Sequence, residues 1–477
     1  MIEKDFSDWL SPMLVKEMRQ GFRSRVFVFA FLLIQGLMIF CVLLGLNFSA
    51  GDSDFSNTFF WFIICAPLLL LPLLGLNVLG SEINQNTMEL LFLTRLSAWR
   101  IVVGKWTAIV AQMLLIVCSV LPYLVLRYFI GGVNLLDDLS FLAWLFCTSA
   151  ILTGVAIASS PFYRSMLTKL FVIVGAIILA IMLMGFLENP ANAISMTGVD
   201  AAQLTAIALC LGPLFLLLMF ETAVSKIAPP AENHSFRKRL IGLVILGAIA
   251  VLNHGAIAKT DLLMVLGAAL VLPICLTALC EEVKPIPSIY LPFVKRGFLG
   301  RIIGMVFYPG WPSGLVFTIL AFGIYLAIFF RDRNMTERSM LLIISMAGAL
   351  VMPAAVEKIA FTKLRKPAVV YYSLQAFMAI VCVLASMLKD TSLERWMLAA
   401  SPLPTSVFFL EAFDKIDTVD RSTYTLTSMV VLVISLAVLL VKCIGPRRQI
   451  AAYEKQARET LMKKPAPAPE IANASAA

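Results

Sequence analysis

The chain of 477 residues is 60% hydrophobic and only 14% charged, with a formal net charge of +9. An ordinary soluble domain has roughly 25% charged residues, and a soluble protein of this size cannot hide so much apolar surface in one or two cores. A disordered chain would be polar and rich in charge. The composition therefore excludes both classes and predicts an all-α, polytopic integral membrane protein.

The leader 1–25 predicts an amphipathic helix on the membrane surface. Between 6 and 20 its apolar side chains recur at spacings of three and four, which places them on one helical face. Basic residues flank that face, so we expect the helix to lie in the headgroup region of the inner leaflet. A merely solvated leader is the alternative. The apolar residues are Phe6, Trp9, Leu10, Met13, Leu14 and Met18.

A six-helix membrane unit is predicted over 26–226. Crossing a bilayer takes about 20 apolar residues. Runs free of Asp, Glu, Lys and Arg cover 26–47, 59–79, 106–126, 141–159, 170–187 and 201–220. Four polar residues, either within the twelve predicted spans or near their ends, are candidates for lining a translocation pathway, although hydrogen bonding between helices explains such residues more simply. They are Gln35, Asn77, Gln112 and Gln375.

The inner loop 80–105, between the second and third spans, is long enough to form a helix–turn–helix. Thr87 is placed to cap a short helix, and Glu89 in its first turn would suit the positive end of the helix dipole. Ser97 is placed to start a second helix that continues into the third span. The loop either docks a cytosolic partner through exposed charges or forms a lipid-facing re-entrant hairpin, and the residue pattern leaves both open. The exposed charges are Glu82, Glu89, Arg95 and Arg100.

A polar inner linker at 227–239 separates this unit from a second six-helix unit at 240–441. Its spans are predicted at 240–258, 262–280, 313–330, 339–356, 368–388 and 422–441, which brings the total to twelve. The first of these is the weakest, because Asn253 and His254 interrupt it. The outer segment 389–421 predicts short interfacial helices. The tail 442–477 is basic and is predicted to be disordered.

The charge distribution predicts that both termini lie on the inner side. With that orientation the inner segments hold 29 of the 38 Lys and Arg residues and 14 of the 29 acidic ones. The net charge is then +15 inside and −6 outside, as the positive-inside rule requires. The basic excess thus reflects topology and attraction to anionic membrane lipids, and it calls for no nucleic acid.

The loop 80–105 also resembles a known family. The pattern Glu82…Thr87-Met-Glu89-Leu90-Leu…Leu96-Ser97…Arg100…Gly104-Lys105 resembles the loop after the second span of type-2 ATP-binding-cassette (ABC) exporter permeases. The leader Ser11-Pro12-Met-Leu-Val-Lys16-Glu17-Met-Arg19…Arg23 is similar to the elbow helix that opens the same family. The resemblance covers roughly residues 1–225.

This resemblance implies a transmembrane subunit of an exporter in a bacterial inner membrane. Its loop would be a coupling helix seated on a separate ATPase subunit, and that subunit would hold the ATP and Mg. A second permease unit would complete the transporter. The implied coupling residues are Glu82, Thr87, Glu89 and Leu90, with Arg95 and Arg100 in the same loop. The implied elbow residues are Pro12, Lys16, Glu17, Arg19 and Arg23.

The chain lacks sequence marks of its own catalysis. A phosphate-binding loop needs Gly-x-x-x-x-Gly-Lys-Ser/Thr, and the only Gly-Lys here is Gly104-Lys105, followed by Trp106. We therefore expect no enzyme activity and no cofactor in this chain. With two His residues and no paired Cys spacing, a structural zinc site is not expected either.

Two rival functions stay open at this stage. A membrane scaffold or assembly factor built on a permease-like half would explain why the second half carries no second copy of the loop pattern. An ion-coupled secondary transporter is disfavoured, because no Asp, Glu, Lys or Arg falls within the predicted spans. Spans without charge suit an amphipathic or lipid-like substrate.

Overall fold

The computed structural model describes residues 12–47, 72, 74–76, 78–80, 83, 97–130, 135–162, 201–229, 231–254, 260–330, 337–360, 370–371, 373–375, 377–378 and 418–462. Throughout these ranges the regular structure is helical, without a strand. The chain divides into two compact units. Unit 1 comprises Met1–Ala228 with Ala256–Lys259, and unit 2 comprises Pro229–Gly255 with Thr260–Ala477. The division falls inside the stretch 227–239 that the sequence marks as a linker.

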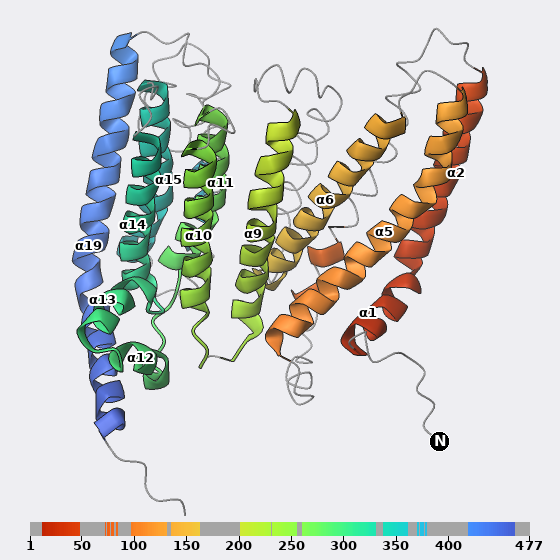
Figure 1. Cartoon of the computed structure of the whole chain (residues 1–477). Helices are drawn as coiled ribbons and strands as arrows, with labels where there is room; N and C mark the ends of the chain where they lie inside the picture. Colours follow the sequence, from red (N-terminus) through yellow and green to blue (C-terminus); the bar gives the residue numbers. More distant parts are fainter. Residues whose placement is uncertain are drawn as a thin grey trace, which may run out of the picture. The chain divides into compact units, whose positions relative to one another are not determined.

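Unit 1 is built from helices that pack against one another (Figure 1). They are α1 (Pro12–Phe22), α2 (Arg25–Asn47), α5 (Ala98–Ile130), α6 (Leu135–Ser159) with the 3-10 turn η1 (Ser160–Phe162), and α9 (Ala201–Ile227). α5 is the central element, since α1, α2, α6 and α9 all pack against it. α1 lies at one end of α2, and the two helices meet at a bend of 58°.

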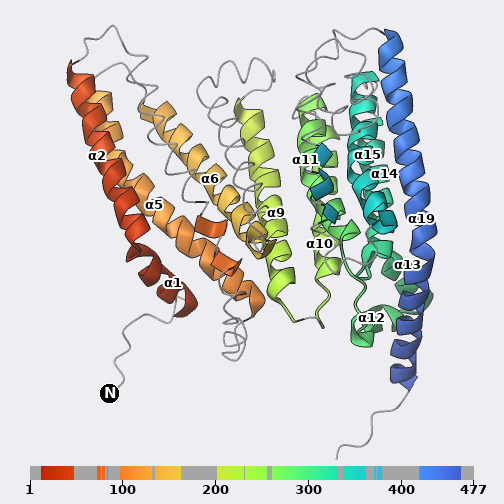
Figure 2. The ribbon, with the colours of Figure 1, turned by 180° about the vertical axis from the view of Figure 1, so that it is seen from behind.

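Unit 2 is a bundle whose helices run side by side (Figure 2). They are α10 (His234–His254), α11 (Thr260–Leu279), α12 (Pro287–Val294), α13 (Gly297–Phe307), α14 (Trp311–Phe330), α15 (Glu337–Ala360) and α19 (Thr418–Met462). α11 packs against α10 and α14, and α15 packs against α19. The short helices α12 and α13 lie together at one end of this bundle, with α12 against α19.

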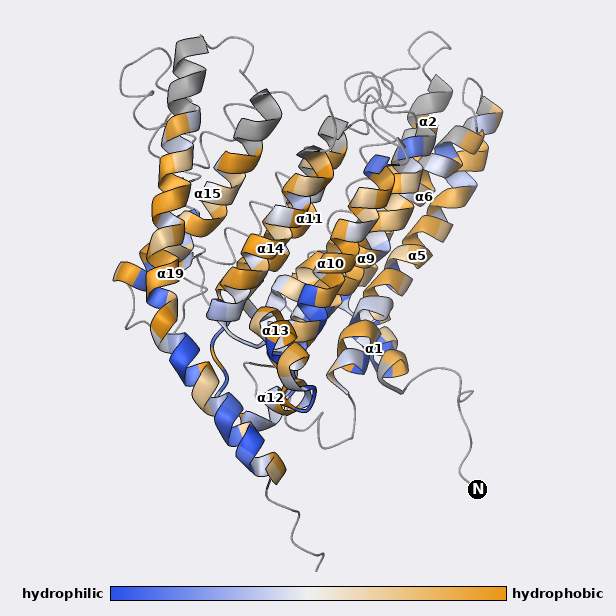
Figure 3. Cartoon of the chain, turned by 60° about the vertical axis from the view of Figure 1, so that its left-hand side comes forward, coloured by the Kyte–Doolittle hydropathy of each residue, from blue (hydrophilic) through white to orange (hydrophobic). Residues whose placement is uncertain are grey.

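The helices have the composition of membrane spans. Among the described residues six helices are long and apolar enough to cross a bilayer, or seven if the bent pair Leu14–Phe22 and Phe27–Phe40 forms one span. Many of their large apolar side chains face outward, among them Phe29, Leu209 and Val433, with exposed fractions of 69%, 72% and 59%. The ribbon coloured by hydropathy shows that hydrophobic residues predominate along these helices (Figure 3). These features fit a multi-pass membrane protein.

The described helices account for only part of the twelve predicted spans. The predicted spans 59–79, 170–187 and 368–388 lie wholly or mostly outside the described residues, as do most of the coupling loop 80–105 and of the outer segment 389–421. α10 and α11 do form helices over the predicted spans 240–258 and 262–280. The apolar part of α11 is short, however, and covers Leu266–Leu279.

The predicted disordered tail 442–477 is wrong for residues 442–462, because α19 continues without a break from the predicted span to Met462. Three of its residues on this stretch are buried, Cys443, Ile450 and Ala457, and successive ones lie two helical turns apart, so they share one face. Ile450 and Ala457 join a hydrophobic cluster with Tyr290 and Phe293 of α12. The composition of this stretch does not reveal the buried apolar face, because basic residues surround it. Residues 463–477 lie outside the described part of the chain.

Candidate functional site

The first end of the predicted coupling loop is held by a serine at the base of α6. The hydroxyl oxygen of Ser160 accepts hydrogen bonds from the backbone amides of Leu79, at 3.0 Å, and Gly80, at 2.9 Å. Ser160 is fully buried. Gly80 lies so close that a Cβ there would come within 2.9 Å of the Ser160 carbonyl oxygen. The start of the loop is therefore fixed to α6.

The second end of the loop leads directly into α5. Ser97 precedes the helix, and its hydroxyl accepts a hydrogen bond from the Arg100 amide at 3.4 Å. The prediction that Ser97 starts a helix running into the third span is thus confirmed, since α5 extends from Ala98 to Ile130. The Arg100 side chain is exposed and turned away from the core. Of the implied coupling residues it is the only one whose side chain the described ranges include.

Lys105 ties this second end to α1. Its side chain is only 4% exposed, and its Nζ lies 3.3 Å from Glu17 Oε1. One turn later along α1, Gly21 sits against Gln112 of α5 so closely that a Cβ would collide with the amide group of Gln112. Glu17 and Gln112, predicted separately as an elbow residue and a pathway residue, therefore belong to one α1–α5 contact.

The remaining elbow residues show the two faces of α1. Lys16, Arg19 and Arg23 are exposed. Leu14 and Phe22 are half-buried. The described part of the helix runs from Pro12 to Phe22, and residues 1–11, where the predicted apolar pattern starts, lie outside the described part. Five of the six coupling residues and one pathway residue also lie outside the described part of the chain. They are Glu82, Thr87, Glu89, Leu90, Arg95 and Asn77.

Two further pathway candidates are engaged in hydrogen bonds between helices. Gln35 of α2 donates from Nε2 to Ser119 Oγ of α5 at 2.6 Å and accepts from the Tyr123 hydroxyl at 2.9 Å. Gln375 donates to the Ala349 carbonyl of α15 at 2.7 Å. These bonds satisfy the side-chain amides, which is what the packing interpretation predicts.

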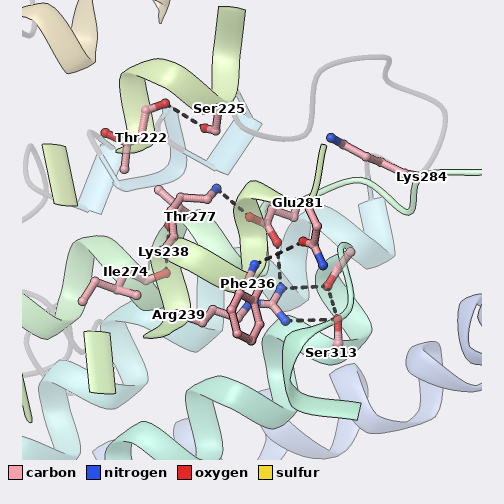
Figure 4. Close-up of polar contacts among 12 residues, drawn as sticks. Thr222, Ser225, Phe236, Lys238, Arg239, Ile274, Thr277, Glu281, Lys284 and Ser313 are labelled. Carbon is pink, nitrogen blue, oxygen red and sulfur yellow. Dashed lines mark hydrogen bonds and ion pairs between the residues drawn. The ribbon is translucent and has the colours of Figure 1, made fainter. Parts of the chain in front are cut away.

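A buried group of charges organises one end of unit 2, and we call it the Arg239 clasp. It consists of Lys238 and Arg239 on α10, Glu281 after α11, and Ser313 on α14 (Figure 4). Arg239 is 1% exposed, and its NH2 lies 2.7 Å from Glu281 Oε2. Lys238 Nζ lies 2.6 Å from the other oxygen, Glu281 Oε1. One carboxylate thus serves as the counterion of two cations.

Arg239 also arranges the turn between α13 and α14. Its NH1 donates to the carbonyls of Val306, at 2.5 Å, and Tyr308, at 2.9 Å, and to Ser313 Oγ at 3.2 Å. Its NH2 donates to the Gly310 carbonyl at 3.3 Å. Gly310 has φ +123°, a conformation that favours glycine. The planar guanidinium matches several acceptors at once, which a lysine could not do.

Burial and the ion pair shift the pKa values of Glu281 and Arg239. Burial by itself would raise the pKa of Glu281, but the attraction of Lys238 and Arg239 and hydrogen bonds from Lys238 and Ser235 outweigh it, so the pKa falls to about 2. Burial lowers the pKa of Arg239, while Glu281 opposes that shift. A charged, doubly paired carboxylate at neutral pH is the state this arrangement favours.

Sequence reasoning missed the clasp, although a signal was present. Lys238-Arg239 and Glu281-Glu282 stand at the inner ends of two successive predicted spans, which an antiparallel pair brings together. The topology prediction uses only the total charge on each side of the membrane, so the opposite signs of these neighbouring residues go unused. Within the described ranges no group of three or more His, Cys, Asp or Glu could hold a metal ion. The clasp is therefore a structural element that fixes α10, α11 and α14 to one another.

Removing the Ser160 hydroxyl should destabilise unit 1. Ser160→Ala leaves the amides of Leu79 and Gly80 without this acceptor in a buried place, which costs about 1–3 kcal/mol. Thermal unfolding of the purified protein in detergent would show a lower melting temperature. The matched control is Ser159→Ala, because the Ser159 hydroxyl bonds only within its own helix, to the Ala156 carbonyl. Equal shifts for the two variants would contradict the anchoring role.

Comparisons with family models, with curated proteins and with solved structures return no match to this chain.

Proposed function

We propose that the chain is the transmembrane subunit of an ABC-type exporter in a bacterial inner membrane, driven by a separate ATPase subunit that holds ATP and Mg. The observation that carries the proposal is the anchoring of the loop 80–105 at both of its ends. Ser160 fixes the start of the loop to α6, and the Glu17–Lys105 pair fixes its end to α1 and α5. A segment held in this way can pass on a force from outside the membrane.

The mechanism follows from these anchors. When two ATPase domains close on ATP, the displacement is applied to the coupling residues around Glu89. Two rigid connections then carry it onward, one into α6 and one into α5 and α1. Because α2, α6 and α9 pack on α5, a tilt of α5 moves the whole of unit 1. The substrate would pass at an interface with a second permease unit, and the apolar spans suit an amphipathic or lipid-like molecule.

A scaffold function is the second candidate, and unit 2 supplies the observation in its favour. The segment 306–313 around the turn that precedes α14 accepts four hydrogen bonds from one side chain, that of Arg239. Such a segment resists displacement, unlike a loop that must follow an ATPase. Unit 2 would then stabilise a complex, while unit 1 alone receives the force.

Glu89→Lys tests the exporter proposal. We expect the wild-type chain to co-purify with a protein that carries the Gly-x-x-x-x-Gly-Lys-Ser/Thr loop, and the variant to lose that protein by at least about tenfold, because a reversed charge at a docking surface costs several kcal/mol. Mass spectrometry of the purified complex identifies the partner. Membrane insertion and the elution volume of the variant should be unchanged.

Glu459→Lys is the matched control, because Glu459 is an exposed acid on α19, far in sequence from the loop. It should retain the ATPase. Retention of the ATPase by Glu89→Lys would refute the coupling assignment. If the wild-type chain binds such an ATPase but reconstituted vesicles show no ATP-driven movement of a fluorescent lipid, the scaffold function is favoured.

A further inference from the structure

Helix α13 has an unusual distribution of side chains. Its buried residues are glycines, Gly300 and Gly304, which lie one turn apart on the same face. A Cβ at Gly300 would collide with the carbonyl oxygen of Phe293 in α12, and one at Gly304 would collide with the ring of Tyr308. The small face is thus required for close packing against the chain.

The large apolar side chains of α13 point the other way. Phe298, Leu299, Ile302 and Met305 have exposed fractions of 77%, 70%, 46% and 52%. Burying apolar surface is worth about 25 cal/mol per Å², so leaving such a face in water is costly. The ribbon of α13 is correspondingly apolar in Figure 3. A helix that buries glycines and exposes bulky apolar residues is built for apolar surroundings outside the chain.

The position of α13 identifies those surroundings. The helix ends at Phe307, and a turn of three residues leads to α14, which begins at Trp311 and is long and apolar enough to cross a membrane. α13 packs against α14 and lies at the same end of unit 2 as the Arg239 clasp. It is therefore held at the level where a membrane span begins, which is the boundary between headgroups and acyl chains.

Positive charge surrounds the exposed face. Lys295 and Arg296 are exposed at the turn that precedes α13, and Arg301 on α13 is 48% exposed and lies 3.4 Å from Glu454 of α19. Arg447 and Arg448 are exposed on α19 within two turns of Glu454. The acidic groups of α19 in the same range are Glu454, which pairs with Arg301, and the exposed Glu459. The basic residues exceed them in number, which is complementary to an anionic lipid surface.

We propose that α13 is an interfacial anchor whose apolar face is embedded in the leaflet at the clasp end of unit 2, with Lys295 and Arg296 binding the headgroups of anionic phospholipids. The inference does not depend on the transport function, since it concerns only how unit 2 is seated in the bilayer. It also explains why the α12–α13 pair is packed so closely, because a shallow anchor must be fixed firmly to its span.

Photocrosslinking of the full-length protein tests the proposal. Phe298 is replaced by the photoreactive amino acid p-benzoylphenylalanine, and the protein is reconstituted in vesicles of equal parts phosphatidylcholine and phosphatidylglycerol. After irradiation, intact-mass spectrometry should show addition of one phospholipid. The phosphatidylglycerol adduct should exceed the phosphatidylcholine adduct by at least about twofold, since each basic residue near the surface favours anionic lipid.

Two controls separate the parts of the proposal. The same replacement at Met462, which is 77% exposed at the end of α19, should give no lipid adduct. Lys295→Gln with Arg296→Gln should keep the adduct at Phe298 but abolish the preference for phosphatidylglycerol. A crosslinked dimer in place of a lipid adduct would identify a second copy of the chain as the occupant and overturn the proposal, as would the absence of any adduct. An unchanged lipid preference in the double variant would overturn the headgroup assignment.

Discussion

Replacing Glu281 with Gln is expected to lower the free energy of unfolding by about 3–5 kcal/mol, the usual cost of removing one partner from a buried ion pair. The carboxylate is the counterion of both Lys238 and Arg239. Arg239 cannot reorient toward solvent, because its guanidinium is hydrogen-bonded to backbone carbonyls. The neutral amide leaves two buried cations beside each other. Thermal unfolding in detergent, followed by circular dichroism, measures the loss.

The same carboxylate predicts a dependence on pH. The pKa of Glu281 is about 2 in the folded protein against an ordinary value of 4.5. A folded-state pKa below the unfolded one means that the carboxylate stabilises the protein above about pH 4.5 and that this contribution disappears as the pH falls toward 2. The melting temperature of the wild type should therefore drop toward that of Glu281→Gln over this interval.

Glu282→Gln is the matched control, because Glu282 is the next residue and its side chain is exposed. Exposed charges contribute about 0–1 kcal/mol, so this variant should melt close to the wild type. If Glu281→Gln and Glu282→Gln melt together, or if the difference between wild type and Glu281→Gln is the same at pH 7 and pH 3, the clasp does not stabilise unit 2 as described.

The second large effect is expected at the contact between α1 and α5. Glu17→Lys places two positive charges together at a site where Lys105 is 4% exposed, and Lys105→Glu places two negative charges there. Each single variant should reduce ATP-driven transport at least about tenfold, because like charges in a poorly hydrated contact separate the two helices. The double variant Glu17→Lys/Lys105→Glu restores an attractive pair and should recover most of the activity.

This exchange distinguishes coupling from folding. If the chain is an exporter subunit as proposed, ATP hydrolysis and ATPase binding should change little in the single variants, since the proposed docking residues around Glu89 are untouched, whereas transport falls. Lys16→Glu is the control, as its side chain is exposed on the same helix. Equal losses of hydrolysis and transport, or failure of the double variant to regain transport, would contradict a role for this pair in passing on movement.

The fold class and several local features follow from the sequence, while others depend on packing that no single pattern reveals. Ser97 could be recognised because a cap acts on its own neighbours in sequence. The Glu17–Lys105 pair could not, because its partners lie 88 residues apart and only the docking of α1 on α5 joins them. Helix α13 and its exposed apolar side chains were not predicted, because its 11 residues are too few for a span and fall between the predicted spans 262–280 and 313–330.

The sequence draws attention to some polar residues and not to others. Gln35 and Gln375 were noticed because they stand inside apolar runs, yet each is satisfied by a neighbouring helix. The residues that organise unit 2, Lys238, Arg239 and Glu281, stand just outside such runs, where charge is expected and draws no attention. Charges at adjacent span ends become informative only when their signs are compared in antiparallel pairs.

The order of residues in the Arg239 clasp has a consequence for biosynthesis. Arg239 leaves the ribosome first, Glu281 follows 42 residues later, and the carbonyls of Val306, Tyr308 and Gly310 arrive last. Arg239 and its carboxylate are therefore both synthesised before the turn that the guanidinium holds. The guanidinium gains its carbonyl partners only when the segment between α13 and α14 has been made, so this end of unit 2 can be completed only after that segment is in place.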